Sequence, residues 1–199
     1  KEAQESIGNW SHDTLLSEFL VKLFADVRSE GKLELLFPWD MLEQGVVSSS
    51  TPWQPHQWAP MVWNTTKGTL IPDAAIMFHD PARPAGQNHS LLLVEIDRGT
   101  EALERYQNGS NTIRAKLEKY LAAYREGKHA ETFGVRNMRV AFVTTSRQRI
   151  QGMQRLLREI GIDQRMFLFS PIRDVHECTT LLGLGWVNNR REACYLTGR

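Results

Sequence analysis

Residues 90–97, with the sequence SLLLVEID, decide the fold class of this chain. The apolar run from Leu91 to Val94 is typical of a strand that is buried on both faces at the centre of a sheet. Glu95 and Asp97 end the same stretch. Because side chains alternate between the two faces of a strand, we expect these two carboxylates to point the same way.

Helical and strand patterns flank this stretch on both sides. Apolar residues at helical spacing predict a helix over 13–30, with Ser11 or Asp13 as its N-cap and Gly31 at its end. Further strands are expected over 33–37, 70–78, 140–143 and 166–169, further helices over 111–126 and from a cap at 144–146 to 160, and a terminal hairpin over 186–196. This order predicts one α/β domain over residues 1–199, a mixed central sheet flanked by helices.

Composition excludes several classes of protein. A hydrophobic content of 41% with 24% charged residues excludes a disordered or fibrous chain. The formal net charge of +1 means that any nucleic-acid site must be a local patch. Two cysteines, Cys178 and Cys194, are too few for a disulfide framework or a cysteine-based zinc site, which favours the cytoplasm. No apolar run approaches the roughly 20 residues of a membrane helix. The chain starts at Lys1 without a methionine, so we expect a preceding segment.

The acidic residues between 73 and 97 are the most informative for function. Asp73 follows a proline at the start of one predicted strand, and Glu95 and Asp97 end the next. If the strands are neighbours, three carboxylates meet at one sheet edge, which is costly unless a positive charge neutralises them. Mg²⁺ or Mn²⁺ would suit such a cluster where phosphate is the substrate. Alternatively, Asp97 pairs with Arg98 or Arg114, and Asp73 only shapes a turn.

The ordered motifs resemble a known superfamily and, within it, a known family. Pro72-Asp73, Glu95-Ile96-Asp97 and a helix with Lys116 and Tyr120 resemble the PD-(D/E)xK nuclease superfamily. More narrowly, the segments IPDAAIMF, LLLVEIDRGTE, KLEKYLAAY and VAFVTTSRQRI, within residues 10–172, resemble the replication-relaxation family of plasmid and mobile-element proteins. The resemblance implies a restriction-endonuclease-like fold, DNA as the partner and an upstream winged helix-turn-helix.

The resemblance also implies roles for individual residues. Asp73 and Glu95 would hold a metal ion, and we expect Asp97 as a third ligand and catalytic acid. Asp97 stands where the superfamily has a lysine, and an acid cannot stabilise a negatively charged phosphorane. Lys116 is the expected substitute, because it shares a helix face with Tyr120. The alternative for Lys116 is a surface lysine whose stem lies beside the apolar stripe.

Two residues near the start of the first helix bear on the same site. His12 falls on the side of the apolar stripe and is expected either to approach the site as a donor or ligand, or to be a structural histidine. Glu18 falls nearly opposite the stripe, which argues against a catalytic role. On the later helix, Lys119 lies on a different side from Lys116.

Arginines and tryptophans supply the expected DNA contacts. Guanidinium groups suit bidentate binding of phosphate. The arginines predicted to contact DNA are Arg98, Arg114, Arg147 and Arg149. The tryptophans that could stack on unpaired bases, or instead fix their loop to the core, are Trp53, Trp58 and Trp63.

These observations favour a DNA-binding nuclease-like domain that has lost hydrolysis, because Asp97 replaces the lysine. The alternative is an active Mg²⁺- or Mn²⁺-dependent endonuclease that nicks DNA through Asp73, Glu95 and Lys116. Relaxases or other mobilisation and replication proteins are the expected protein partners, and a homodimer stays open. A protein-interaction domain without DNA contact is a third, weaker alternative.

Overall fold

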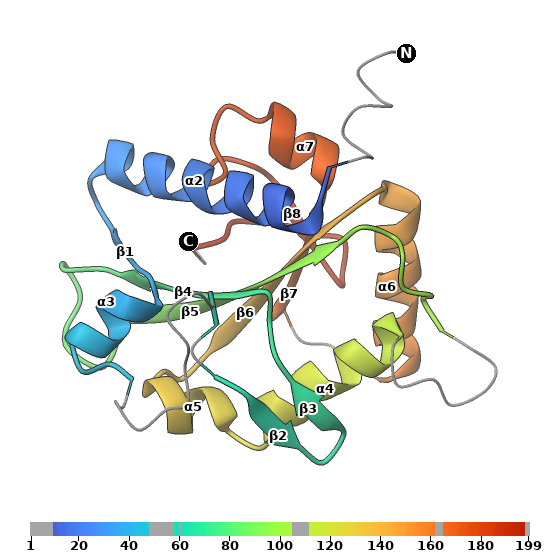
Figure 1. Ribbon diagram of the computed structural model, residues 1–199, viewed down its shortest axis with the longest axis horizontal. Coiled ribbons are helices and arrows are strands. Elements are labelled where there is room, and N and C mark those ends of the chain that lie inside the picture. Colours follow the sequence, from blue (N-terminus) through green and yellow to red (C-terminus); the bar gives the residue numbers. More distant parts are fainter. Residues whose placement is uncertain (1–9, 48–57, 60, 105–111, 162–164, 198–199) are drawn as a thin grey trace.

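The computed structural model describes residues 10–47, 58–59, 61–104, 112–161 and 165–197 (Figure 1). The helices are α2 (His12–Glu30), α3 (Pro38–Glu43), α4 (Ile113–Arg125), α5 (Lys128–Phe133), α6 (Arg147–Glu159) and α7 (Ile172–Glu177). The strands are β1 (Glu34–Leu36), β2 (Trp63–Thr65), β3 (Gly68–Leu70), β4 (Ala74–His79), β5 (His89–Asp97), β6 (Met138–Thr144), β7 (Phe167–Pro171), β8 (Trp186–Asn188) and β9 (Ala193–Cys194). No helix in these ranges is both long and apolar enough to cross a membrane.

Seven strands form one mixed sheet in the order β1-β4-β5-β6-β7-β8-β9, and β2 and β3 form a separate hairpin. β5 pairs antiparallel with β4 and parallel with β6, which in turn pairs parallel with β7. Residues 91–97 of β5 are all buried. The prediction of a mixed sheet with a buried strand at its centre is therefore confirmed.

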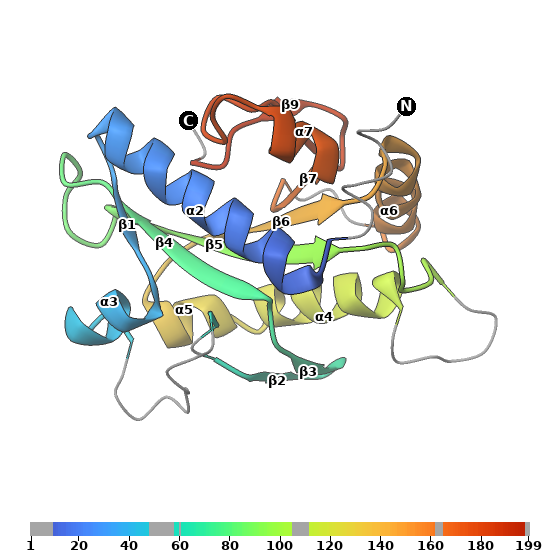
Figure 2. The same ribbon diagram turned by 45° about the horizontal axis from the view of Figure 1, so that its top comes forward.

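Two layers of helices cover this sheet. α4, α5 and α6 lie on one face, and α2 and α7 lie on the other (Figure 2). The side chains of β5 alternate between the layers: Leu91 and Leu93 join the core beneath α4 and α6, whereas Leu92, Val94 and Ile96 join the core beneath α2. The odd-numbered residues of β5 therefore face α4 and α6.

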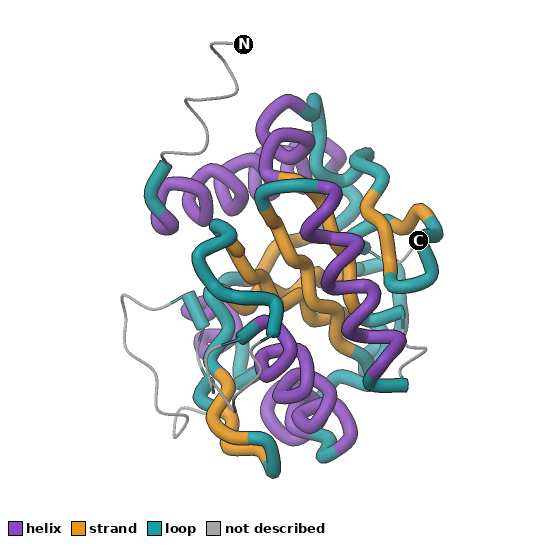
Figure 3. The backbone as a smooth tube through the Cα atoms, turned by 90° about the vertical axis from the view of Figure 1, so that its right-hand side faces the viewer, coloured by secondary structure: helices purple, strands orange, loops and turns teal. Residues whose placement is uncertain are grey.

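The carboxyl ends of β5, β6 and β7 lie at one edge of the sheet, on the side from which Figure 3 is viewed. Both long helices of the layer formed by α4, α5 and α6 begin near this edge: α4 has Thr112 as its N-cap, and α6 has Ser146. Each cap side chain accepts a hydrogen bond from a backbone N–H of the first turn, as expected for these residue types. Residues that end β5 therefore lie close to residues that begin two helices.

Most predicted elements are present, with differences where the local signal is weak. α2 begins after Ser11 and ends at Gly31, whose φ of 66° is left-handed. The terminal hairpin is β8–β9. The strand predicted over 70–78 is divided, because Pro72 cannot donate to a strand ladder: Leu70 ends β3, and β4 begins two residues after the proline. The six-residue helices α3, α5 and α7 were not predicted, because one or two turns show no clear periodicity.

Candidate functional site

Two acidic side chains of β5 point into the layer of α4 and α6. Glu95 and Asp97 occupy odd positions, so they face the same layer as Leu91 and Leu93. Glu95 is 1% exposed and Asp97 is 7% exposed. Because a buried carboxylate is unfavourable without donors, each of the two must have partners of its own.

Helix α4 supplies the partners of Glu95. The Nζ atom of Lys116 lies 3.0 Å from Oε2 of Glu95. The hydroxyl group of Tyr120, one turn further along the helix, donates a hydrogen bond to Oε1. The predicted shared face of Lys116 and Tyr120 is therefore present, and both oxygens of Glu95 are engaged.

The pKa values of Glu95, Lys116 and Tyr120 are all raised, but only that of Glu95 moves toward neutral pH. Burial raises the pKa of Glu95 to about 7, against the opposing effect of the Lys116 ammonium group, and the negative charge of Asp73 adds to the rise. Burial alone would lower the pKa of Lys116, but the charges of Glu95 and Glu101 raise it above its ordinary value. Burial and the charge of Glu95 raise the pKa of Tyr120 well above its ordinary value. Glu95 is therefore the group that titrates near neutral pH.

Asp73 lies beside Glu95 at the start of β4. Its backbone N–H donates to the carbonyl oxygen of Val94 at 3.1 Å. Its Oδ2 atom accepts a hydrogen bond from the N–H of Ile96 at 2.7 Å and lies 2.9 Å from Nε2 of His12. The structure thus brings Asp73 and Glu95 together across β4 and β5.

His12 is the first residue of α2 and contacts the site through Asp73. Burial alone would lower the pKa of His12, but the hydrogen bond to Asp73 and its charge, together with Asp13, raise it above the ordinary value. The imidazole therefore gains a proton more readily when Asp73 is charged. His12 reaches the site as a partner of a carboxylate.

Asp97 has a separate and complete set of partners. Its Oδ1 atom accepts hydrogen bonds from the N–H of Gly99 at 3.0 Å and from Nη2 of Arg149 at 2.8 Å. Its Oδ2 atom accepts from the hydroxyl group of Thr144 at 2.6 Å and from Nε of Arg149. This is the bidentate geometry that a guanidinium group forms with a carboxylate.

The expected convergence of three carboxylates is therefore wrong for Asp97. Side chains two residues apart on a strand are separated by about 7 Å, so α4 serves Glu95 while the first turn of α6 serves Asp97. Neither arginine considered from the sequence as the partner of Asp97 takes that role. Among the described residues, no group of three or more His, Cys, Asp or Glu side chains is arranged to hold a metal ion.

Glu101, which the sequence reasoning missed, lies beside Lys116. Its Oε1 atom lies 3.5 Å from Nζ of Lys116. Its Oε2 atom is buried and has no hydrogen-bond partner within the described part of the chain. Its carbonyl oxygen accepts from Nη2 of Arg149 at 2.6 Å. The only signal in the sequence was its position in the run Asp-Arg-Gly-Thr-Glu, which starts at the last residue of β5.

Arg149, which the sequence predicted as a DNA contact, is instead engaged within the protein. Its side chain is only 13% exposed. Its donors are committed to the carboxylate of Asp97 and the carbonyl oxygen of Glu101. Arg149 therefore links the end of β5 and the following loop to α6, and only a small part of its side chain stays exposed.

The other predicted arginines lie at the surface to different degrees. Arg98 is exposed directly after β5. The side chain of Arg147 at the start of α6 is 80% exposed and lies 3.0 Å from Asp174. Arg114 forms an ion pair with Glu159 on α6. Arg98 and Arg147 are thus better placed than Arg114 to meet a ligand.

Two residues that the helical wheel places away from the site also lie elsewhere in the structure. Oε1 of Glu18 is 2.7 Å from Nδ1 of His176 on α7, on the other face of the sheet. The stem of Lys119 lies against Gly68 of the β2–β3 hairpin. Both positions agree with the helical-wheel reasoning.

Two of the three predicted tryptophans, Trp58 and Trp63, lie within the described residues, and both pack against other parts of the protein. Trp63 is 4% exposed, and its indole N–H donates to Thr132 at 2.9 Å. The ring of Trp58 packs against Trp39, with centroids 5.4 Å apart. Trp53 lies outside the described residues. Trp58 and Trp63 therefore fix their segments to the protein, which was the alternative interpretation.

The divalent ion implied by the superfamily does not fit these residues as they are arranged. Both oxygens of Glu95 accept hydrogen bonds from α4, and both oxygens of Asp97 are held by Arg149. The ammonium group of Lys116 is therefore the cation that pairs with Glu95.

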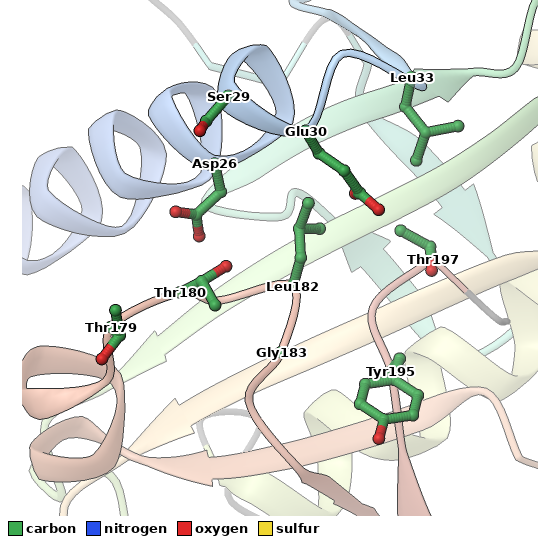
Figure 4. A pocket seen from close by; sticks show the side chains of 10 residues that line it. All are labelled: Asp26, Ser29, Glu30, Leu33, Thr179, Thr180, Leu182, Gly183, Tyr195 and Thr197. Atoms are coloured by element: carbon green, nitrogen blue, oxygen red, sulfur yellow. The ribbon is translucent and has the colours of Figure 1, made fainter.

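A cavity of about 630 Å³ lies elsewhere, between the end of α2 and the C-terminal segments (Figure 4). None of the site residues lines this cavity.

These contacts define an α/β domain with a buried carboxylate–lysine–tyrosine site at the carboxyl edge of its parallel strands. In a comparison with protein families, the replication-relaxation family matches residues 2–138, which is more than half of the chain and includes Asp73, Glu95 and Lys116. The chain belongs to the replication-relaxation family. No curated protein and no solved structure matched the chain.

Proposed function

We propose that this chain is the DNA-binding, nuclease-like domain of a protein for plasmid or mobile-element replication or mobilisation, and that it acts without hydrolysing DNA. Membership of the replication-relaxation family supports the biological setting. The order Asp73, Glu95, Lys116 supports the likeness to PD-(D/E)xK nucleases. Relaxases and other mobilisation proteins are the protein partners that this setting suggests.

The engagement of Glu95 is the observation that carries the proposal. A hydrolytic site needs carboxylate oxygens that are free to act on water or on an ion near the phosphate. Here Lys116 neutralises the carboxylate of Glu95, and Tyr120 occupies its second oxygen. The site therefore has the residue types of a nuclease site, but both oxygens of Glu95 are already engaged by side chains of α4.

Two exposed arginines support DNA binding at the same edge. Arg98 follows β5 and Arg147 follows β6, and these strands are neighbours. Adjacent strands are about 4.8 Å apart, so both guanidinium groups start from the edge that carries Asp73 and Glu95. Arginine suits phosphate because its planar fork can bind two oxygens.

A gel-shift titration with plasmid fragments at two salt concentrations tests DNA binding. We expect the double variant R98A/R147A to bind about tenfold more weakly and to lower the salt slope by about 2, one for each arginine that no longer binds a phosphate. R158A is the matched control, because Arg158 is exposed near the other end of α6. Equal losses of affinity in both variants, or no binding by the wild type, would refute the proposal.

An active nickase is the second candidate, because Asp73 and Glu95 are both retained beside a lysine. Supercoiled plasmid is incubated with the protein and Mg²⁺ or Mn²⁺, and the open-circular form is measured. We expect no nicking by the wild type. Nicking that is lost in D73A and E95A would establish the nickase instead, and nicking that survives both substitutions would indicate a contaminant.

A further inference from the structure

A second cavity, of about 230 Å³, lies at the carboxyl end of β7, two strands away from β5. Its walls come from the last residues of β7, the first two turns of α6, the first turn of α7 and strand β8. Because α6 follows β6 and α7 follows β7, both helices begin at this edge of the sheet, on the side that Figure 3 shows. Arg147, one of the two proposed DNA contacts, lines the cavity. The cavity therefore lies next to the proposed path of DNA.

One part of the cavity wall is apolar. Phe169 of β7 and Val187 of β8 are paired across the two strands, and both line the cavity. Ile150 of α6 belongs to the same wall and is 4% exposed. A flat ring placed against these side chains leaves water, so this wall favours an aromatic or heterocyclic group.

Helix α6 supplies a polar face to the same cavity. Arg147, Gln151 and Gln154 lie at positions i, i+4 and i+7, which share one side of a helix, and all three line the cavity. Gln154 is 2% exposed, and its Nε2 atom donates to the carbonyl oxygen of Asn188 at 2.6 Å. Gln151 is exposed. Its amide offers both a donor and an acceptor, as the edge of a nucleobase does.

The turn between β8 and β9 holds a second arginine, Arg191, at this cavity. The side chain of Asn188 is fully buried and accepts hydrogen bonds from two backbone N–H groups of this turn, at 2.9 and 3.0 Å. The carbonyl oxygen of Asn188 accepts from the N–H of Arg191 at 3.1 Å and also from Gln154. The turn and α6 are thus tied together, which fixes the backbone that carries Arg191.

The residues that line the cavity carry a net positive charge. Their two guanidinium groups, on Arg147 and Arg191, face one carboxylate, that of Asp174. Arg147 lies 3.0 Å from Asp174, but its side chain is 80% exposed. Exposed ion pairs contribute little free energy, so Arg147 can exchange this carboxylate for a phosphate, which its planar fork also binds.

We propose that this cavity binds one unpaired nucleotide of a DNA strand. The base lies against the apolar wall, the amide of Gln151 pairs with its edge, and the two guanidinium groups bind the adjoining phosphates. Pockets for drug-sized ligands measure about 300–1,000 Å³, so a cavity of about 230 Å³ limits the occupant to about one base. The inference rests on the proposed function, because the strand reaches the cavity through its contact with Arg147.

Binding of a labelled DNA duplex with one bulged nucleotide, followed by fluorescence anisotropy, tests the cavity. The comparison is the same duplex whose bulged nucleotide lacks its base. Because a packed base strengthens binding, we expect the whole chain to bind the bulge with a base about fivefold more tightly, or better. Equal affinity for the two duplexes would overturn the inference alone, whereas a wild type that binds neither duplex would refute the proposed function as well.

Gly185 allows the cavity to be filled. It lines the cavity, its φ is not left-handed, and a Cβ atom placed on it meets no other atom within 4 Å. We expect G185F to lose the preference for the bulged base and to keep the affinity for the duplex that lacks it. G185A adds only a methyl group and should behave like the wild type. A G185F variant that keeps the preference would overturn the inference.

Q151A should also reduce the preference for the bulged base, and it tests the same cavity if G185F does not fold. Q148A is the matched control, because Gln148 is an exposed glutamine of α6 that does not line the cavity. Equal effects of the two substitutions would contradict the role of Gln151. Free dAMP and dTMP, in large excess over the protein, should not displace the bulged duplex. Displacement by them that G185F abolishes would assign the cavity to a free nucleotide and overturn the inference.

Discussion

Glu95 and Asp97 lie two residues apart on one strand, face the same layer and are both nearly inaccessible to solvent. They differ in how completely their charges are paired. Asp97 is saturated by the fork of Arg149, a hydroxyl group and a backbone N–H. Glu95 has one ammonium group, which it shares with other acids, and one phenol. The comparison shows that the helix that supplies the cation decides whether a buried acid is fully paired within the protein or shares its cation with another acid.

The largest expected effect comes from removing the guanidinium group from the Asp97–Arg149 pair. R149M leaves the carboxylate of Asp97 buried without its cation, and we expect a loss of about 3–5 kcal/mol in the free energy of unfolding. Equilibrium unfolding in urea measures it. The double variant D97L/R149M should recover most of the loss, because two apolar groups leave no buried charge. A loss below 1 kcal/mol in R149M, as is typical of surface pairs, would show that the bond is exposed in solution.

The next largest effect is the contribution of Glu95 to the pH dependence of stability. Its pKa rises from 4.5 to about 7 on folding, so between these values the folded protein binds more protons at Glu95 than the unfolded chain does. Stability therefore falls as the pH rises from 4.5 to 7, by up to about 3 kcal/mol. Urea unfolding at a series of pH values should show this slope in the difference between wild type and E95Q, whose amide does not titrate.

A difference between wild type and E95Q that stays constant from pH 4.5 to 7 would contradict the raised pKa of Glu95.

The smallest expected effect concerns the pair of His12 and Asp73, at the outer side of the site. Asp73 raises the pKa of His12, so D73N should lower that pKa toward or below its ordinary value. The pair stabilises the fold below the unfolded pKa, and this contribution is lost as the pH rises through the raised value. Since the His12 side chain is 37% exposed, we expect less than about 1 kcal/mol.

An NMR titration of the imidazole signals measures the His12 effect directly. His89 is the internal control, because burial and the charge of His79 lower its pKa at the opposite end of β5. Its titration should not change in D73N. An unchanged His12 titration in D73N would show that the contact between the two side chains does not persist in solution.

The sequence by itself determined the central strand, the N-terminal caps of α2 and α6 and the facing of side chains on each element. A run of apolar residues such as Leu91 to Val94 is typical of a strand buried on both faces, and residues four apart on a helix share a face. For these reasons the meeting of Asp73 with Glu95, and of Lys116 with Tyr120, was predictable. Local periodicity fixes such relations before any tertiary contact forms.

Only the tertiary structure decided which charges pair. Arg149 lies 52 residues from Asp97 in the chain, and nothing in its local sequence distinguishes it from Arg147, which faces solvent. Glu101 belongs to a loop without periodicity, so its place beside Lys116 depends on how α6 docks. The partner of a buried charge is set by which helix end meets the sheet edge, because Coulomb attraction acts across space and not along the chain.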